Sequence, residues 1–453
     1  MLSEVFSSSS LRQKQVGGLV VVRGLSRLLF IRFQYNGNIY KQAYFTGSMD
    51  KETILNVLKR WNIWESDINT GIVREKYIQD IYPYLERKEV LVLKGIRRSG
   101  KSTIMQQLMR ELVKKDKVSK NQLLYLNLED HNFAQDLNIS LFDDVLKFYQ
   151  GHTKNKKRVY FFIDEIQKVS GWERWIRTKY DLQEHIKFVV SGSSASLLSK
   201  ELSTLLTGRN LSFIIRPLSF NEVLIFDKKI SLQEYMQFGG FPEVVLEKSP
   251  EKKLKILQQY FEDIVHKDII DRYEIRNTKQ LLNLARYLVS VAGAKVSINK
   301  LSKTFGISKD AIANYINYMI DAYLLFEVPF FSFSAKVKHD VARLPKLYVL
   351  DNGLINVVEV KYSKNEGQMF ENTVLIKLLE QFKEVSYWSD AGSEVDFVVE
   401  GKAINVIAAD KIPAREWKGL EEFQRIHKQF SLLLVTKSID KDNTIPLKRF
   451  MED

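Results

Sequence analysis

One short segment limits the fold of this chain more than any other. Residues 95–102 read Gly-Ile-Arg-Arg-Ser-Gly-Lys-Ser, which matches the pattern G-x-x-x-x-G-K-[ST]. An apolar run, VLVLK (90–94), precedes the segment, and a run with helical periodicity, TIMQQLMRELV (103–113), follows it. Glycines at this spacing let backbone N–H groups turn inward around a phosphate, and the following helix adds unpaired donors and the positive end of its dipole. The segment therefore predicts a strand, a nucleotide-binding loop and a helix in an α/β domain.

The polar residues of this loop have expected parts in holding ATP and Mg²⁺. Lys101 is expected to reach the β- and γ-phosphate oxygens and to act in catalysis. Ser102 is expected to coordinate Mg²⁺ through its hydroxyl. The residues predicted to contact the nucleotide are Gly95, Arg98, Ser99, Gly100, Lys101, Ser102 and Thr103.

A second motif, VYFFIDE (159–165), is an apolar run that ends in two carboxylates. At the carboxyl end of a strand beside the loop, Asp164 is expected to hold Mg²⁺ through water. Glu165 is expected to orient and deprotonate the attacking water. Phosphoryl transfer needs positioning and charge neutralisation more than covalent chemistry, and this pair supplies both. A water-activating glutamate favours hydrolysis over transfer to a small molecule.

Two further residues are candidates for contact with the γ-phosphate. Ser193 follows the apolar run KFVVS (187–191) and is predicted to sense that phosphate, although a serine there can also simply cap a helix. Arg209, in LTGR (206–209), is predicted to reach a nucleotide in its own or a neighbouring subunit, as a trans-acting arginine finger.

The order of the apolar runs predicts the fold class. Five runs are almost continuously apolar, as strands of a parallel sheet covered on both faces are: 90–94, 123–128, 159–163, 187–191 and 212–216. A stretch with helical periodicity follows, and the last third alternates strands with two helices. The prediction is an α/β protein with a P-loop parallel-sheet ATPase core, a helical lid, a winged helix-turn-helix and a small C-terminal α/β domain. Predicted boundaries are 1–55 for an N-terminal β-hairpin extension, then 56–225, 226–275, 276–335 and 336–453 for these four modules.

The helix-turn-helix pattern consists of a helix at 298–304, a turn containing Gly306, and a second helix at 308–322, followed by an apolar stretch that suits a wing. Side chains that the second helix could offer to DNA are Lys309, Asn314, Asn317 and Tyr318. A DNA-reading helix usually carries more Arg or Lys, so a packing or dimerisation role is the alternative.

Charge and composition narrow the classes of partner. The chain carries a net charge of +13, and the whole basic excess lies in residues 1–330, which permits double-stranded DNA as a partner of the front and middle of the chain. Ordinary solvation of the surface explains the same charge. The absence of cysteine excludes disulfides and thiolate metal sites, and the six histidines show no metal-ligand spacing. No apolar run approaches the roughly 20 residues that span a bilayer. A cytoplasmic protein without membrane contact is expected.

Nine segments together resemble one family: GIRRSGKST (95–103), LNLED (126–130), FIDEIQ (162–167), SGSS (191–194), LTGR (206–209), PLSFNE (217–222), GGFPEVV (239–245), VLDNGLIN (349–356) and EVDFVV (394–399). They are similar to the prokaryotic AAA-like P-loop ATPases described as archaeal-type ATPases. The resemblance implies an ATPase module, a helical lid, a winged helix and a C-terminal domain of unknown function with a restriction-endonuclease-like fold. It implies no cellular role, and residues 1–50 lie outside it.

A working nuclease of that type needs a helix glutamate, a strand-end aspartate and an acid-x-Lys pair on the next strand. Glu371 and Asp396 match the first two positions. The third element falls on Ala408 and Asp410, so the acid and the lysine are both missing. Two nearby lysines could in principle substitute, Lys402 and Lys411. The C-terminal domain is therefore predicted to be an inactive nuclease with a structural or partner-binding role.

Three functions follow from these patterns. The leading one is a Mg²⁺-dependent ATPase whose nucleotide state switches the attached winged-helix and C-terminal domains. The alternative is a slow or non-hydrolysing, nucleotide-gated regulator or scaffold associated with DNA. The third is an ATPase-gated nuclease. The sequence is compatible with a homo-oligomer and with a protein partner.

Overall fold

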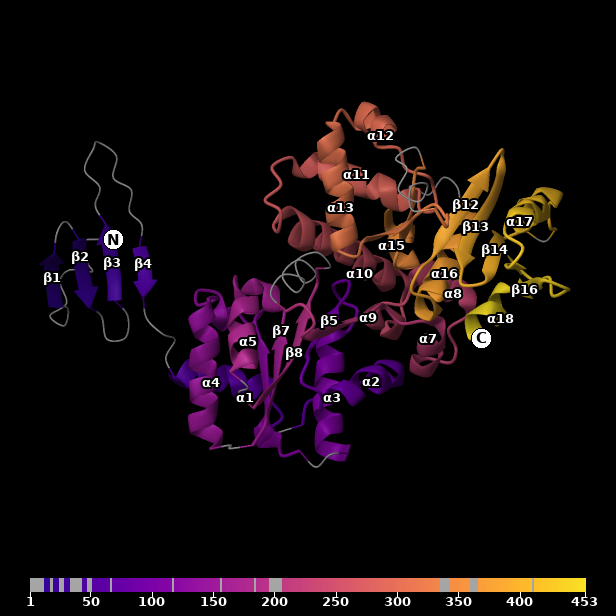
Figure 1. Cartoon of the computed structure of the whole chain (residues 1–453). Helices are drawn as coiled ribbons and strands as arrows, with labels where there is room; N and C mark the ends of the chain where they lie inside the picture. The colour runs from indigo at the N-terminus through magenta and orange to yellow at the C-terminus, as the bar shows by residue number, and fades with distance from the viewer. Residues whose placement is uncertain are drawn as a thin grey trace.

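A computed structural model describes residues 51–65, 67–115, 118–154, 157–182, 185–194, 206–334, 343–358, 366–409 and 411–453, together with the backbone of four strands before residue 47 (Figure 1). Those four strands, β1 (Arg12–Val16), β2 (Leu19–Arg23), β3 (Leu28–Arg32) and β4 (Ala43–Thr46), pair antiparallel in the order β1-β2-β3-β4. The sequence predicts one hairpin at this place; its turn at Asn36-Gly37 lies outside the described residues.

The core of the nucleotide-binding region is a five-stranded parallel sheet in the order β6-β7-β8-β5-β9. The strands are β5 (Val90–Lys94), β6 (Leu123–Asn127), β7 (Val159–Asp164), β8 (Ile186–Gly192) and β9 (Asn210–Ile214), at the five places that the apolar runs predict. Side chains of β5 alternate between two separate cores, because Val90 and Val92 face one and Leu91 and Leu93 the other. Burial on both faces explains why these strands read as continuous apolar runs.

Helices cover both faces of this sheet (Figure 1). On one face lie α1 (Lys51–Trp61), α4 (Ile139–Thr153) and α5 (Trp172–Asp181), and on the other lie α2 (Glu75–Ile81) and α3 (Lys101–Lys115). Short 3₁₀ turns connect these elements: η1 (Tyr82–Tyr84), η2 (Lys120–Gln122), η3 (His131–Phe133) and η4 (Ile166–Lys168). The arrangement leaves the carboxyl ends of the strands, where β5 and β7 end, free to form a site.

A helical region follows β9. It contains α7 (Phe220–Phe226), α8 (Leu232–Phe238), α9 (Pro242–Leu246), α10 (Pro250–Asp263), the π-helix η5 (Ile264–Ile270), α11 (Thr278–Ser290), α12 (Ile298–Phe305) and α13 (Lys309–Asp321). The predicted helix-turn-helix corresponds to α12 and α13, and Gly306 ends α12 with φ of 64°. The apolar stretch after α13 forms β10 (Leu325–Val328), which pairs antiparallel with β11 (Lys346–Val349). The strand expected as a wing thus joins the first strand of the C-terminal region.

The C-terminal region is built on a mixed sheet in the order β12-β13-β14-β15-β16. Its elements are α15 (Asn352–Val358), α16 (Glu366–Gln381), β12 (Ser386–Asp390), β13 (Ser393–Val399), β14 (Lys402–Ile407), α17 (Ala414–Ile426), β15 (Ser431–Thr436), β16 (Thr444–Pro446) and α18 (Leu447–Glu452). The chain end packs back on the helical region, since Asn221 Nδ2 in α7 donates to the carbonyl oxygen of Glu452 at 3.2 Å.

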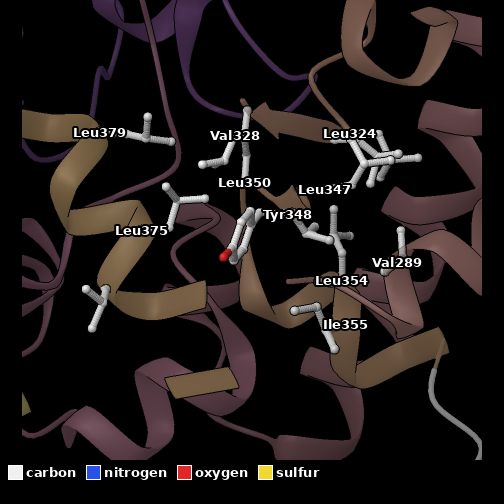
Figure 2. Packing of buried hydrophobic residues seen from close by; sticks show 14 of the residues in the cluster. Val289, Leu324, Val328, Leu347, Tyr348, Leu350, Leu354, Ile355, Leu375 and Leu379 are labelled. Atoms are coloured by element: carbon white, nitrogen blue, oxygen red, sulfur yellow. The ribbon is translucent and has the colours of Figure 1, made fainter. Parts of the chain in front are cut away.

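One hydrophobic core joins the helical region to the C-terminal region. Its buried side chains are Ile96 of the nucleotide loop and residues between Leu218 and Met451. Figure 2 shows part of it, where Val289 of α11, Leu354 of α15 and Leu375 of α16 surround β10 and β11. Elements that the sequence divides among four modules therefore share buried apolar surface, so a displacement of one element changes the packing of the others. Among the described residues, no helix is both long and apolar enough to cross a membrane.

Candidate nucleotide site and a second buried cluster

The predicted loop joins β5 to α3 in a tight, strained turn. Gly95, Arg98 and Gly100 have φ angles of 152°, 67° and 94°. A Cβ on Gly95 would lie 2.0 Å from the carbonyl oxygen of Ile215, so only glycine fits there. A Cβ on Gly100 would meet nothing closer than 3.9 Å, so the loop is open on that side. The glycines thus do what the motif requires, one for close backbone approach and one for an unobstructed turn.

The side chain of Lys101 folds back over the loop. Its Nζ donates to the carbonyl oxygens of Gly95 at 3.0 Å and Ile96 at 3.1 Å, and the residue is buried. The same nitrogen lies 4.0 Å from Glu165 Oε1. A buried ammonium held by neutral carbonyls is available to a phosphate, because a phosphate oxygen carries the opposite charge and a carbonyl oxygen carries no net charge.

The two expected Mg²⁺ ligands, Ser102 and Asp164, are linked by a tyrosine that the sequence does not single out. The hydroxyl of Tyr125 donates to Asp164 Oδ2 at 2.7 Å and is also hydrogen-bonded to the Ser102 side chain. Burial, and then the charge of Asp164, keep the pKa of Tyr125 well above its usual value, so the phenol stays a donor. Asp164 Oδ1 also accepts from the Ser191 hydroxyl.

This donor set fits Mg²⁺ bound together with a nucleotide. One hydroxyl and one carboxylate are few protein ligands, and Mg²⁺ typically takes one or two carboxylates, substrate phosphates and waters. The described residues contain no group of three or more His, Asp or Glu side chains placed to hold a metal by themselves. Residues Ser102 and Asp164 therefore suit Mg²⁺ only when phosphate oxygens complete its coordination.

Glu165 begins a turn directly after β7. Its φ of 57° is left-handed, an uncommon conformation for glutamate, and its N–H donates to Ser191 Oγ at 3.1 Å. Its carboxylate accepts from Gln167 Nε2. Burial raises the pKa of Glu165, and Asp164 raises it further, while Lys101 opposes the shift. A carboxylate with a raised pKa beside a phosphate site is suited to take a proton from water.

Ser193 is brought into the site, and its main partners come from the helical region. Its Oγ donates to Asp268 Oδ1 at 2.7 Å and accepts from Arg272 Nη2 at 3.1 Å. Asp268 in η5 also binds Arg97 of the loop, with 2.9 Å between Asp268 Oδ2 and Arg97 Nε. Arg97, Asp268 and Arg272 are site residues that sequence reasoning misses. Asp268 and Arg272 lie 75 and 79 residues after Ser193, in a helical run of ordinary composition.

Arg209 lies elsewhere. Its carbonyl oxygen accepts from the N–H of Val90 at the beginning of β5, and its Nε lies 3.4 Å from Asp181 Oδ1. The loop follows the end of β5, so Arg209 sits at the opposite edge of the sheet. The structure does not bring this arginine to the loop of its own chain.

The other loop residues surround the open side. Arg98 is exposed, with its guanidinium carbon 5.4 Å from the centre of the Tyr260 ring. Ser99 is buried, while Ser102 and Thr103 are half-buried in the first turn of α3. Ser99 is also held from behind, because its carbonyl oxygen accepts from Arg74 Nη1 at 2.9 Å. Arg74 is a buried arginine that sequence reasoning overlooks.

Buried polar atoms without a hydrogen-bond partner lie around the loop and favour a bound ligand there. Within the described part of the chain, six buried side-chain atoms have no hydrogen-bond partner, and three of them lie around the loop: Ser99 Oγ, Gln167 Oε1 and Arg272 Nη1. A buried donor or acceptor left without a partner costs about 1–3 kcal/mol. Two of the three, Ser99 and Arg272, can donate to an oxyanion, which fits a phosphate-bearing ligand.

A second cluster lies in the C-terminal region. Glu371 of α16 and Asp396 of β13 come together as the sequence predicts, each 3.2 Å from Nζ of the buried Lys346. Glu394 lies 2.7 Å from the same nitrogen. Burial alone would lower the pKa of Lys346, but the three carboxylates raise it above its usual value. Burial, and then Asp396, raise the pKa of Glu371 to about 7.

The lysine of this cluster is not where the sequence places it. The expected acid-x-Lys pair falls on Ala408 and Asp410; Ala408 is half-buried and Asp410 lies outside the described residues. The two candidate substitutes, Lys402 and Lys411, are exposed. Lys346 comes instead from β11, a strand that precedes Glu371, so no spacing rule on one strand identifies it.

Two motifs of the resemblance meet in a buried junction. The carboxylate of Asp351 accepts from the N–H groups of Gly240 at 2.7 Å and Gly353 at 2.8 Å. A Cβ on Gly239 would lie 1.8 Å from Asp351 Oδ1, and one on Gly240 would lie 2.0 Å from the carbonyl oxygen of Leu218, which explains the paired glycines of GGFPEVV. Burial raises the pKa of Asp351 to about 7, although both N–H groups oppose the shift. These motifs hold the helical region against α15.

The predicted DNA-reading side chains divide into two groups. Lys309, Asn314 and Asn317 are exposed on α13. Tyr318 is half-buried and stacks on Tyr273, with 3.7 Å between ring centres and an angle of 11° between the planes. Tyr318 therefore serves a contact within the chain, between α13 and the turn that follows η5.

Comparison with known proteins finds family models that match the chain after residue 86. Three family models match consecutive parts: an AAA domain over residues 87–224, a domain of unknown function (DUF8612) over 229–365, and a domain of unknown function (DUF4143) over 366–450. Two solved structures align with just over half of this chain. They are C. elegans PCH-2 (TM-score 0.26, 13% identity, 56% of this chain and 72% of that one) and a DNA polymerase III gamma subunit-related protein from Thermotoga maritima (TM-score 0.29, 12% identity, 54% and 97%). At these TM-scores the likeness carries no argument.

Proteins found by sequence comparison are much more similar to this chain than these two structures are. The uncharacterized protein MJ1544 of Methanocaldococcus jannaschii is 34% identical over 350 residues, which cover 72% of this chain and 75% of that protein. An uncharacterized protein of Haemophilus influenzae is 30% identical over 342 residues, which cover 72% of this chain and 83% of that protein. The chain therefore belongs to the family of these uncharacterized archaeal and bacterial proteins, and its residues 87–224 form an AAA domain of the ATP-binding type.

Proposed function

We propose that this protein is a Mg²⁺-dependent ATPase that hydrolyses ATP to ADP and phosphate, and that its nucleotide state changes how the helical and C-terminal regions are held. The observation that carries the proposal is the convergence of Lys101, Asp164 and Glu165 at one edge of the sheet. Lys101 Nζ lies 4.0 Å from Glu165 Oε1, and Asp164 is tied to Ser102 through Tyr125.

In this proposal the residues of the chain have separate tasks. The backbone of the loop, Lys101 and the N-terminus of α3 bind the phosphates. Ser102 and Asp164 hold Mg²⁺, which when bound neutralises charge on the phosphate oxygens. Glu165 accepts a proton from the water that attacks the γ-phosphorus, while the bond from that phosphorus to the bridging oxygen of ADP breaks. Arg209 stays a proposal for a neighbouring subunit, since it lies at the far edge of its own sheet.

The exposed part of α12 and α13 supports the alternative function, a nucleotide-gated regulator or scaffold associated with DNA. Lys300, Lys303 and Lys309 are all exposed there. In this alternative α12, α13 and β10 act as a winged helix. The three lysines would then contact DNA phosphates and position the protein on a duplex without reading its sequence.

For the C-terminal region we propose a restriction-endonuclease-like fold without nuclease activity. The support is the ammonium of Lys346, which lies between the carboxylates of Glu371, Glu394 and Asp396 at 2.7–3.2 Å. A cation fixed among these carboxylates neutralises the charge that would attract a divalent metal. The region then serves as a structural or partner-binding module.

Phosphate release, measured with and without Mg²⁺ and with and without duplex DNA, tests the function. Turnover that requires Mg²⁺ and rises with DNA is expected if α12 and α13 bind a duplex. A rate of phosphate release that is the same with and without DNA would indicate a protein partner or a second copy of the chain instead. ATP binding without any turnover leaves only the alternative, a nucleotide-gated regulator. Plasmid nicking in Mg²⁺ or Mn²⁺ would contradict the proposal for the C-terminal region.

A further inference from the structure

The carboxylate of Asp268, in the helical region, lies against the nucleotide loop. Its side chain is 1% exposed and belongs to the π-helix η5. Oδ2 lies 2.9 Å from Arg97 Nε, and Oδ1 accepts from Ser193 Oγ at 2.7 Å and from Arg272 Nη2 at 3.4 Å. Asp268 thus engages two arginines and a serine hydroxyl at once.

The partners of Asp268 are groups that bind phosphate as readily as carboxylate. Guanidinium groups bind both anions through paired N–H donors, and a hydroxyl donates to either. Arg97 belongs to the loop itself, and Ser193 follows the strand beside Asp164 and Glu165. Arg272 keeps its buried Nη1 without a hydrogen-bond partner among the described residues. This arginine therefore holds one donor that Asp268 does not use.

We propose that Asp268 stands in for the γ-phosphate of ATP. Without nucleotide, its carboxylate neutralises Arg97 and Arg272; when ATP enters, its γ-phosphate takes over both arginines and Asp268 is released. ADP has no γ-phosphate and leaves Asp268 in place. Asp268 therefore sets the preference for ATP over ADP, and Arg272 contacts the γ-phosphate from within the same chain. The inference rests on the proposed nucleotide site and adds how its occupancy is detected.

The position of Asp268 gives this exchange a route to the helix-turn-helix. A π-helix is a wide, uncommon turn that often occurs at functional sites, and η5 leads directly into Arg272 and Tyr273. Tyr273 stacks on Tyr318 of α13 and donates to Asp321 at 3.0 Å. Movement of η5 on release of Asp268 would therefore act on α13 through one pair of stacked rings.

Calorimetric titration of the full chain with ATP and with ADP, in a Glu165→Gln background that prevents turnover, tests the proposal. Asp268→Asn removes the competing charge, so ATP affinity should rise about fivefold or more while ADP affinity stays within about twofold. Arg272→Gln removes a charge-assisted bond to the γ-phosphate, so ATP affinity should fall about tenfold with ADP affinity unchanged. The matched control is Asp271→Asn, an exposed aspartate on the same turn, which should change neither affinity.

Thermal unfolding gives a second readout. Asp268→Asn loses its ion pairs with Arg97 and Arg272, so its Tm should lie below that of the parent without nucleotide and with ADP. In saturating ATP the two Tm values should converge, since ATP has replaced Asp268 in both proteins. An unchanged ratio of ATP to ADP affinity, or a Tm gap that persists in ATP, overturns the proposal. ATP binding without turnover in the parent chain would remove the hydrolysis proposal and leave this one; binding of neither nucleotide would remove both.

Discussion

Lys101 and Glu165 face each other across the nucleotide loop, with 4.0 Å between the ammonium nitrogen and the nearer carboxylate oxygen. One follows β5 and the other follows β7, and β8 lies between these two strands in the sheet. The pair is buried, so the charge of each is balanced by the other until a phosphate enters. In the proposed mechanism this ion pair couples binding of nucleotide to activation of water.

As pH is lowered, the rate of hydrolysis is predicted to fall at a higher pH than it would with a catalytic carboxyl of ordinary pKa. Glu165 must be ionised to accept a proton, and its burial raises its pKa above the usual 4.5. As pH decreases through this raised pKa, the base is lost and kcat falls. The pH profile of kcat at saturating ATP and Mg²⁺ measures the effect. A profile that stays flat down to about pH 4.5 would exclude Glu165 as the base.

Tyr125→Phe is predicted to weaken the use of Mg²⁺. The variant loses the hydroxyl that joins Ser102 to Asp164, so the carboxylate is less well oriented and a bond of about 1.5–3 kcal/mol to a charged group is removed. The Mg²⁺ concentration for half-maximal turnover should rise. Tyr149→Phe is the matched control, since the hydroxyl of this buried tyrosine donates to the carbonyl oxygen of Asn121 away from the loop. An equal effect of both substitutions would show a general packing defect instead.

Asp351→Asn is predicted to remove one component of the pH dependence of stability. The pKa of Asp351 is about 7 in the folded chain and near 3.8 when unfolded, so the folded state keeps a proton that the unfolded state releases. The free energy of unfolding therefore falls with rising pH between about pH 4 and 7, by up to about 1.4 kcal/mol per pH unit. In the asparagine variant this fall should disappear.

The free energy of unfolding, measured by chemical denaturation from about pH 4 to about pH 8, checks this prediction. The signal should report on the region that contains α15. The introduced amide would keep one acceptor for the N–H of Gly353 but lose the bond from Gly240, so the variant is also less stable at low pH. Asp390→Asn, at an exposed aspartate, serves as the control and should leave the pH dependence as it is. Parallel curves for the parent and Asp351→Asn would count against the assignment.

Lys346→Met is predicted to destabilise the C-terminal region in a pH-dependent way. Removing one partner of a buried ion cluster costs about 3–5 kcal/mol, because Glu371, Glu394 and Asp396 are left facing one another. The cost should be smaller below about pH 7, where Glu371 with its pKa of about 7 takes up a proton. Urea unfolding at about pH 6 and about pH 9, on either side of that pKa, measures it. Exposed Lys402→Met is the control, and an equal loss at both pH values would contradict the charge argument.

Much of the fold can be predicted because the signals are local. The loop residues Gly95 and Lys101 carry a fixed spacing, and the five core strands are continuous apolar runs, since each is buried on both faces. Asp164 and Glu165 end one such run, so their place at the sheet edge follows from the strand itself. Glu371 and Asp396 are likewise recognised from their positions on a helix and a strand.

The missed residues share a different property, because tertiary contacts alone bring them to the site. Asp268 and Arg272 reach Ser193 only through the packing of η5, and nothing in their sequence neighbourhood marks them. Tyr125 reads as one more apolar strand residue until its hydroxyl is seen on Asp164. Lys346 lies on a different strand from the one where the acid-x-Lys pattern looks for a lysine.

Single-turnover release of phosphate from bound ATP measures whether hydrolysis depends on Glu165. The wild-type chain with Mg²⁺ should release phosphate, and Glu165→Gln should bind ATP with similar affinity but release phosphate about 10²–10⁴-fold more slowly. Equal rates for the two proteins, with ATP bound by both, would show that Glu165 is not the catalytic base.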